Sequence, residues 1–227
     1  MVENRIAKLD PNEDDLWRCY NYLLLSSDRS RIRKLLIRYR LFEMSLSVPG
    51  DIVECEVFKG AGLCYWAKLL EIFAHNSRKQ VIGFDGFGFF KELPLQPGEQ
   101  DNASRHDSIA ERTGKEEITD AVNLAGLAHR IELVEGDIAQ SAPAYVQRRY
   151  GFRISLLHLD LDTYGGTKAA LNAFWPVVSP GGVIIFDEYA VDGMGESNAV
   201  DEFLKDANVG LSAVPFSETP TAYLIKS

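Results

Sequence analysis

The chain has 227 residues and a formal net charge of −9, with 46% hydrophobic and 25% charged residues. This size and composition predict a soluble globular protein with one main core. The acidic balance argues against a general nucleic-acid binder, because phosphate binding needs a basic surface. No apolar run approaches the ~20 residues of a membrane span. We therefore expect neither a nucleic-acid nor a membrane partner.

The cysteines and the N-terminal segment favour a cytoplasmic location. Cys19, Cys55 and Cys64 are odd in number and show no metal-ligand spacing, and Cys55 falls within an expected strand. This pattern favours a reducing compartment over a disulfide framework. Residues 1–15 are polar and lack the apolar core of a signal peptide.

Two helices are expected near the N-terminus, at residues 16–25 and 31–44. The second has arginines on one side and an apolar face on the other. We assign to the apolar face Ile32, Leu35, Leu36, Tyr39 and Phe42. The arginines are interpreted as a solvated face, and the alternative is a lid that meets an anionic group of a ligand. We divide the chain into a helical extension or lid (1–47) and a main domain (48–227), and expect the apolar helices to pack between subunits of a homo-oligomer.

The first central strand is expected at residues 51–58, and it leads through a turn with Gly60 and Gly62 into a helix at 63–74. This geometry leaves backbone N–H groups free to hold a cofactor. The dinucleotide fingerprint G-x-G-x-x-G is absent from this turn, which has only two glycines. A second strand (80–84) ends at Asp85, where an acid commonly receives ribose hydroxyls, although Asp-Gly is also an ordinary turn.

Residues 86–117 read as a long irregular segment, which we interpret as a lid or substrate loop. His106 within it is interpreted as an exposed side chain. A helix is expected at 118–127, and a third strand at 130–134 is followed by Glu135, Gly136 and Asp137. A further helix is expected at 142–150.

The stretch 154–189 predicts a βαβ unit with acids at the ends of both strands. The apolar run 154–159 precedes Asp160, and a second run at 183–186 precedes Asp187 and Glu188. A helix at 167–178, stopped by Ser-Pro-Gly-Gly, joins them. If the strands are neighbours, the three acids converge at the edge where open α/β sheets bind ligands. Hard oxygen donors suit Mg²⁺, Ca²⁺ or Mn²⁺, and the alternative is that the acids only cap strand ends in solvent.

The remaining segments complete the expected fold class. Residues 191–198 predict a flexible loop, 199–207 a helix, and 211–225 two short strands that pair antiparallel at the sheet edge. Five earlier strands alternate with helices. We therefore expect a doubly wound, Rossmann-like α/β sandwich with a mostly parallel sheet.

The order of these motifs resembles the macrocin O-methyltransferase family of class I S-adenosylmethionine-dependent methyltransferases. The resemblance covers residues 30–225 and rests on PGDIVECEVFKGAG, VIGFDGF, VEGD, HLDLDTYGGT, VSPGGVIIFDEY and AVDEF. It implies methyl transfer to a hydroxyl of a sugar or a glycosylated small molecule. The cofactors implied are S-adenosylmethionine and Mg²⁺ or another divalent cation.

The resemblance also implies a role for each matching residue. The methionine part of the cofactor would lie by Glu54, Gly60, Ala61 and Gly62. Asp85 would bind the ribose, and Gly136 and Asp137 would lie by the adenine. The metal would be bound by Asp160, Asp187 and Glu188, with Asp160 also the candidate general base. The family usually has two aspartates where this chain has Asp187 and Glu188.

One departure from the family pattern concerns the first strand. The family has E-x-G, and here the sequence is Glu54-Cys55-Glu56. Glu56 either weakens cofactor binding by its bulk and charge or turns aside. Two other functions stay open at this point. A nicotinamide-dependent oxidoreductase is disfavoured by the missing fingerprint and the paired strand-end acids, and a catalytically weak binding protein with the same fold is favoured by Glu56.

Overall fold

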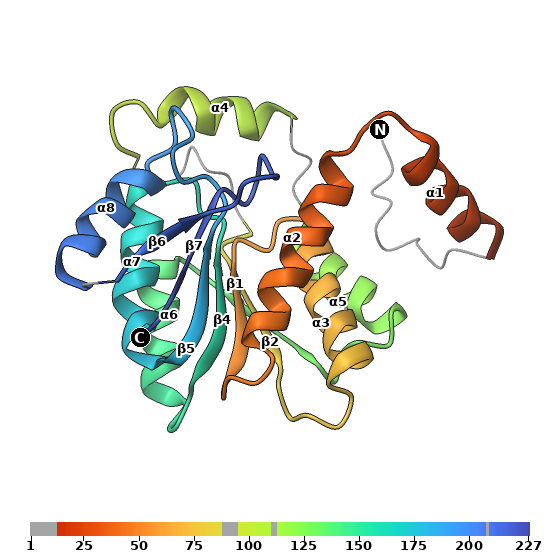
Figure 1. The fold of residues 1–227 in the computed structure, drawn as a ribbon, viewed down its shortest axis with the longest axis horizontal. Helices are drawn as coiled ribbons and strands as arrows, with labels where there is room; N and C mark the ends of the chain where they lie inside the picture. The colour runs from red at the N-terminus through yellow and green to blue at the C-terminus, as the bar shows by residue number, and fades with distance from the viewer. Residues whose placement is uncertain (1–12, 88–94, 110–112, 208) are drawn as a thin grey trace.

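The computed structural model describes residues 13–87, 95–109, 113–207 and 209–227 (Figure 1). The helices are α1 (Glu13–Leu25), α2 (Ser30–Ser45), α3 (Ala61–Phe73), α4 (Gln100–Ile109), α5 (Lys115–Leu124), α6 (Ile138–Arg148), α7 (Tyr164–Phe174), the 3₁₀ turn η3 (Trp175–Val177) and α8 (Glu196–Ala207). The strands are β1 (Asp51–Cys55), β2 (Val81–Asp85), β3 (Ile131–Glu135), β4 (Ile154–Leu159), β5 (Val178–Phe186), β6 (Leu211–Ala213) and β7 (Ala222–Ile225). Within the described ranges, no helix has the length and apolar character needed to cross a membrane.

The seven strands form one sheet in the order β3-β2-β1-β4-β5-β7-β6. Strands β1 to β5 run parallel, and β7 pairs antiparallel with both β5 and β6. The expected doubly wound sheet with an antiparallel strand pair at its edge is therefore confirmed. The strand order reverses between β1 and β4, and at such a switch point open α/β sheets bind their ligands.

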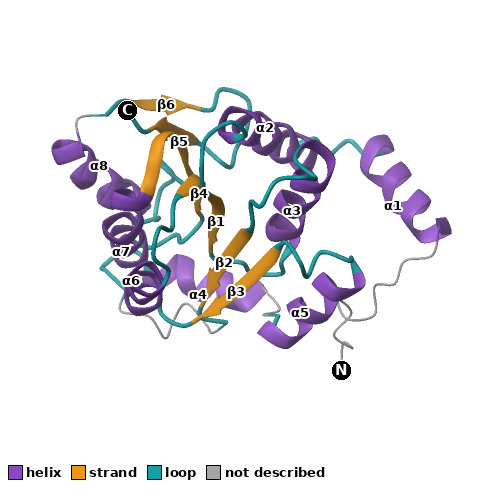
Figure 2. Cartoon of the chain, turned by 90° about the horizontal axis from the view of Figure 1, so that it is seen from below, coloured by secondary structure: helices purple, strands orange, loops and turns teal. Residues whose placement is uncertain are grey.

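Helices cover both faces of the sheet, with α2 and α3 on one side and α6, α7 and α8 on the other (Figure 2). Successive strand side chains point to opposite faces, so each central strand contributes to two cores. In β1, Ile52 belongs to the core under α2 and α3, whereas Val53 belongs to the core under α6 and α7. Burial on both faces explains why these strands read as continuous apolar runs.

Helix α2 is part of the main core, because Ile37, Leu41 and Phe42 are buried against α3 and the sheet. The expected apolar face was wrong at Leu35 and Leu36, which are exposed. The interpretation of the arginines as a solvated face was also wrong for Arg38, which is 8% exposed and faces the sheet edge. In contrast, α1 has no buried residue and projects away from the other elements in Figure 1.

Two segments that we expected to be irregular contain regular structure. Within 86–117, α4 spans Gln100–Ile109, and the side chain of His106 lies outside the described part of the chain. Ser179 to Gly182 lie within β5, which begins at Val178 and is longer than the expected strand at 183–186. Their pairing with β4 shifts register, so these turn-forming residues make an irregularity within the strand.

Candidate active site at the carboxyl edge of the sheet

A buried acid of β1, Glu54, and a buried arginine of α2, Arg38, lie beside the first turn of α3. Gly60 is the N-cap of α3 with φ of 79°, a left-handed conformation that glycine adopts easily, and no side chain caps this helix. A Cβ on Gly62 would lie 2.2 Å from Glu54 Oε1 and 2.7 Å from Arg38 NH1. Glycine at position 62 therefore lets Glu54 and Arg38 approach the N-terminus of α3.

Glu56 lies just after β1, in the loop, with φ of 73°. That conformation costs a non-glycine residue on the order of 1–2 kcal/mol. The expectation that residues 51–58 form one strand was therefore wrong at its end. Position 56, where the family pattern E-x-G has glycine, therefore has a backbone conformation that favours glycine.

We predict that Glu56→Gly stabilises the protein and tightens cofactor binding. Relief of the left-handed conformation, less the entropy cost of glycine, should raise the free energy of unfolding by up to about 1 kcal/mol. Urea denaturation and calorimetry with S-adenosylmethionine measure the two effects. A folded variant with weaker cofactor binding would show that Glu56 is a useful contact.

Asp85 ends β2 and is 5% exposed. Its Oδ2 accepts hydrogen bonds from the backbone N–H groups of Val57 and Phe58, each at 2.9 Å, and its Oδ1 accepts one from Phe87 at 2.6 Å. Asp85 therefore holds the loop after β1 in place. A carboxylate has about four acceptor positions, so one remains for a ligand hydroxyl.

Gly136 and Asp137 follow β3 at the same edge of the sheet. Gly136 has φ of 130°, and the carboxylate of Asp137 caps α6 by accepting a hydrogen bond from Ala139 N at 3.0 Å. Asp137 is exposed, so its side chain and backbone are accessible to a ligand beside β3. The predicted cofactor residues thus share one edge, at the ends of β1, β2 and β3.

A charge-balanced group of side chains lies below the ends of β1, β4 and β5. His158 is fully buried and bridges two carboxylates, with Nδ1 3.2 Å from Glu54 Oε1 and Nε2 2.9 Å from Asp187 Oδ1. Lys34 from α2 donates to Asp187 Oδ2 at 2.7 Å. Arg38 NH2 lies 3.8 Å from Asp160 Oδ2 and 4.0 Å from Glu54 Oε1.

The pKa values of this inner group follow from its charges. Burial would lower the pKa of His158, but its hydrogen bonds to Asp187 and Glu54 raise it above the usual value. Burial would raise the pKa of Asp187, yet the hydrogen bond and charge of His158 and the charge of Lys34 hold it well below its usual range. Each ring nitrogen of His158 faces a carboxylate oxygen, which can only accept a hydrogen bond. Only a protonated imidazole donates from both nitrogens, so His158 forms ion pairs with Glu54 and Asp187.

A second group, made of acids alone, faces the loops after β4 and β5. Carboxylate oxygens of Asp160, Asp162 and Glu188 all lie within 4.8 Å of one another. Asp162 has φ of 60°, and its carbonyl accepts a hydrogen bond from Gly195 N. Glu196 is fully buried, and its Oε1 accepts from the backbone N–H of Glu188 at 3.0 Å.

Burial and mutual repulsion raise the pKa values of these outer acids. Burial and then the charge of Asp160 raise the pKa of Asp162 to about 7. Burial and the neighbouring aspartates raise the pKa values of Glu188 and Glu196 well above their usual values. Clustered carboxylates are stable only with a proton or a cation among them.

The outer acids have the chemistry of a divalent-cation site. They offer hard oxygen donors, and the buried Oε2 atoms of Glu188 and Glu196 have no hydrogen-bond partner among the described residues. Asp187 is the weakest of the three predicted ligands, because His158 and Lys34 already donate to its two oxygens. Asp187 shares a group with Asp160 and His158, whereas Glu188 shares one with Asp160 and Asp162. Because each oxygen of Asp187 keeps a second lone pair, it can still bind an ion beside Asp160, and the donors fit a Mg²⁺-like ion.

Sequence reasoning missed five residues of this site. They are Lys34, Arg38, His158, Asp162 and Glu196. A histidine inside an otherwise apolar strand was a signal for His158, and the D-x-D spacing was one for Asp162. Glu196 fell in an expected loop, which the structure replaces by the first turn of α8.

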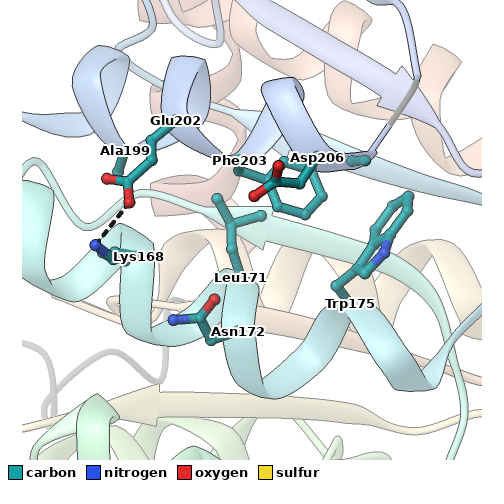
Figure 3. Close-up of a pocket in the computed structure, with 9 residues that line it drawn as sticks. Lys168, Leu171, Asn172, Trp175, Ala199, Glu202, Phe203 and Asp206 are labelled. Atoms are coloured by element: carbon teal, nitrogen blue, oxygen red, sulfur yellow. Dashed lines mark hydrogen bonds and ion pairs between the residues drawn. The ribbon is translucent and has the colours of Figure 1, made fainter.

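The described surface has two hollows. One of about 450 Å³ is lined by two loop segments, 96–99 and 190–198 without Glu196, and not by the outer acids themselves. Its lining residue Gly195 donates a hydrogen bond from its backbone N–H to the carbonyl of Asp162. The other, of about 220 Å³, is shown in Figure 3, where Lys168 and Glu202 form an ion pair across it. Its described lining comes from α7, Trp175 and α8, away from the strand-end acids.

Solved structures that share this Rossmann-like fold include O-methyltransferases. The calicheamicin methyltransferase CalS11 is 27% identical, with a TM-score of 0.75 over 97% of this chain and 90% of that one. The O-methyltransferase NovP, at 23% identity, shares the fold with a TM-score of 0.72 over 86% of this chain and 80% of its own. The Rossmann-like class expected from the sequence is therefore confirmed.

The chain belongs to the macrocin O-methyltransferase (TylF) family, whose profile matches residues 31–214. A tetracenomycin-C rhamnosyl 4'-O-methyltransferase of Streptomyces olivaceus is 25% identical over 148 residues, 64% of this chain. The mycinamicin III 3''-O-methyltransferase of Micromonospora griseorubida is 25% identical over 162 residues, 69% of this chain. The matches span 55% and 61% of these two relatives.

Proposed function

We propose that the protein transfers a methyl group from S-adenosylmethionine to a hydroxyl of a sugar or a glycosylated small molecule, with a divalent cation. One observation supports this proposal most strongly. The acids Asp160, Asp162 and Glu188 lie at the same edge of the sheet as the glycine turn between β1 and α3, in a chain that belongs to this methyltransferase family. In the reaction the bond from the methyl carbon to sulfur breaks and the electron pair stays on sulfur. The sugar oxygen forms the new bond to carbon and loses its proton.

One set of residues would bind the cofactor, and another would bind the cation and the acceptor. The loop with Gly60, Ala61 and Gly62, held by Asp85, would position the reactive methyl group, and positioning supplies much of the rate of an in-line displacement. Asp160, Asp187 and Glu188 would hold the cation. A bound cation would lower the pKa of the sugar hydroxyl and orient it.

We propose that Asp162, rather than Asp160, accepts the hydroxyl proton. Carboxylate oxygens of Asp162, Asp160 and Glu188 lie within 4.8 Å of one another, so Asp162 lies within reach of the two proposed cation ligands. A carboxylate that binds the cation is a weaker base than a neighbour beside it. Without a cation, burial and the charge of Asp160 raise the pKa of Asp162 to about 7. A cation bound beside it would lower that pKa, so the carboxylate would be ionised and able to accept a proton.

The acceptor would enter through the hollow of about 450 Å³. Polar groups in its lining, such as Asp192, Ser197 and Asn198, can accept from or donate to sugar hydroxyls. The named acceptor of the Streptomyces olivaceus relative carries rhamnose, and CalS11 is described as a TDP-rhamnose 3'-O-methyltransferase. Rhamnose nucleotides and rhamnosides are therefore the first acceptors to test.

Calorimetry with S-adenosylmethionine, S-adenosylhomocysteine and NAD, each with and without Mg²⁺, tests the proposal against its two alternatives. We expect both adenosyl ligands to bind and NAD not to bind. Binding of NAD alone would support the oxidoreductase, and the absence of binding by all three would support a binding protein that keeps the fold. Family membership already disfavours the oxidoreductase.

We also propose that the protein is a homo-oligomer in the cytoplasm, and that the N-terminal segment forms its contacts. Helix α1 exposes Leu16, Trp17 and Tyr20, which water solvates poorly. All three cysteines are free thiols, in agreement with a reducing compartment. Sedimentation of the chain with and without residues 1–25 measures the contribution of α1 to association.

A further inference from the structure

The cofactor's amino-acid end has both a carboxylate and an ammonium group, and the turn after β1 offers two buried atoms of matching character. Arg38 Nε, a donor, and Glu54 Oε2, an acceptor, both lack a hydrogen-bond partner in the described part of the chain. Arg38 is 8% and Glu54 2% exposed. Buried polar atoms without partners are costly, so this pair indicates that a zwitterionic ligand completes the site.

Arg38 is also placed beside the N-terminus of α3. Its NH1 lies 2.7 Å from the position that a Cβ on Gly62 would occupy. The first turn of α3 has no side-chain cap, and free backbone N–H groups at a helix start attract an anion. The guanidinium and the helix start therefore converge at the first turn of α3, where glycine at position 62 lets both Arg38 NH1 and Glu54 Oε1 approach the backbone.

The packing around Arg38 holds its guanidinium in this orientation. The guanidinium carbon lies 5.6 Å from the ring centre of Trp66, within the range of a cation–π contact. Its NH2 faces Glu54 and Asp160 at 4.0 and 3.8 Å. These distances exceed those of direct hydrogen bonds, so the acids balance the charge of Arg38 without using up its donors.

We infer that Arg38 binds the carboxylate of the methionine part of S-adenosylmethionine, together with the N-terminus of α3, while Glu54 takes the ammonium group. This inference rests on the proposed function, because it needs an adenosyl cofactor. It changes the interpretation of the arginines of α2, since one of them recognises a ligand. Arginine suits this task because its planar group donates two parallel hydrogen bonds to a carboxylate.

The test compares ligands that differ only at the amino-acid end. Calorimetry should measure S-adenosylmethionine, decarboxylated S-adenosylmethionine and 5'-methylthioadenosine on the wild-type protein, Arg38→Met and Arg38→Lys. Arg40→Met is the control, because Arg40 is an exposed arginine on the same helix. Thermal unfolding of each variant reports folding independently of ligand.

We expect Arg38→Met to weaken S-adenosylmethionine binding about 10- to 100-fold, as for a lost charge-assisted hydrogen bond. Binding of the two ligands without the carboxylate should stay within about 2-fold, and Arg38→Lys should fall between. Equal losses for all three ligands, or no loss for S-adenosylmethionine, would overturn the inference.

The wild-type protein supplies a check that needs no variant. It should prefer S-adenosylmethionine over the decarboxylated form by at least about 10-fold. Equal affinity for the two would overturn the role of Arg38 and leave the proposed methyl transfer standing. If none of the adenosyl ligands binds, the proposed function fails, and the inference fails with it.

Discussion

Asp160→Asn should abolish methyl transfer and leave S-adenosylmethionine binding nearly intact. Asp160 is the acid shared by the inner and outer groups, and it lies within 4.8 Å of carboxylate oxygens on both sides. The amide is isosteric but carries no charge, so the cation site loses its central ligand. Metal activation of a hydroxyl contributes several kcal/mol, so we expect a loss on the order of 10³-fold or more.

The comparison with Asp162→Asn separates binding of the cation from acceptance of the proton. Electron paramagnetic resonance of Mn²⁺ measures cation affinity directly, without turnover. Asp160→Asn should lose both Mn²⁺ affinity and transfer, whereas Asp162→Asn should lose transfer and keep most of its Mn²⁺ affinity. If Asp160→Asn keeps full transfer, Asp160 has no place in the site.

His158→Leu should lower the free energy of unfolding by about 3–5 kcal/mol, the usual cost of removing one partner from a buried ion pair. His158 is completely buried between Glu54 and Asp187. Leucine has a similar volume and donates no hydrogen bond, so two acids lose a donor and a positive charge. Urea denaturation of the cofactor-free protein measures the change.

Two further variants show whether the charge of His158 is responsible. His158→Gln keeps a neutral donor and should cost less than His158→Leu. His75→Leu, at a histidine whose side chain is 72% exposed, should change stability by no more than about 0.5 kcal/mol. A loss for His158→Leu as small as that for His75→Leu would contradict the ion-paired bridge.

Much of the fold could be predicted because the parallel strands are buried on both faces. Runs such as 154–159 then stand out from the surrounding sequence. Helix α4 could not be predicted, since its sequence QDNASRHDSI has no apolar stripe and the helix depends on its surroundings. Glu99, just before it, accepts a hydrogen bond from Tyr164 N at the start of α7, a contact between residues far apart in the sequence.

The placement of acids at the sheet edge was predictable where strand ends alone decide it, as for Asp85, Asp160 and Asp187. The neighbours of a residue were not predictable where they depend on how two strands far apart in the sequence are aligned. Glu54 and His158 are partners across neighbouring strands, and no local pattern gives that pairing. Lys34 and Arg38 were missed for a related reason. The pattern of a single helix places its charged residues in solvent, and these two face the sheet because they pair with acids of other elements.

The central claim is that this family member performs cation-dependent methyl transfer to a sugar hydroxyl. The most direct measurement is mass spectrometry of a rhamnose nucleotide or rhamnoside incubated with the protein and S-adenosylmethionine, with Mg²⁺, with EDTA, and with Mg²⁺ restored after EDTA. We expect a methylated sugar with Mg²⁺, none with EDTA, and recovery when Mg²⁺ returns. Equal amounts of methylated sugar from the metal-free protein would contradict cation-dependent transfer and remove the proposed role of Asp160, Asp187 and Glu188.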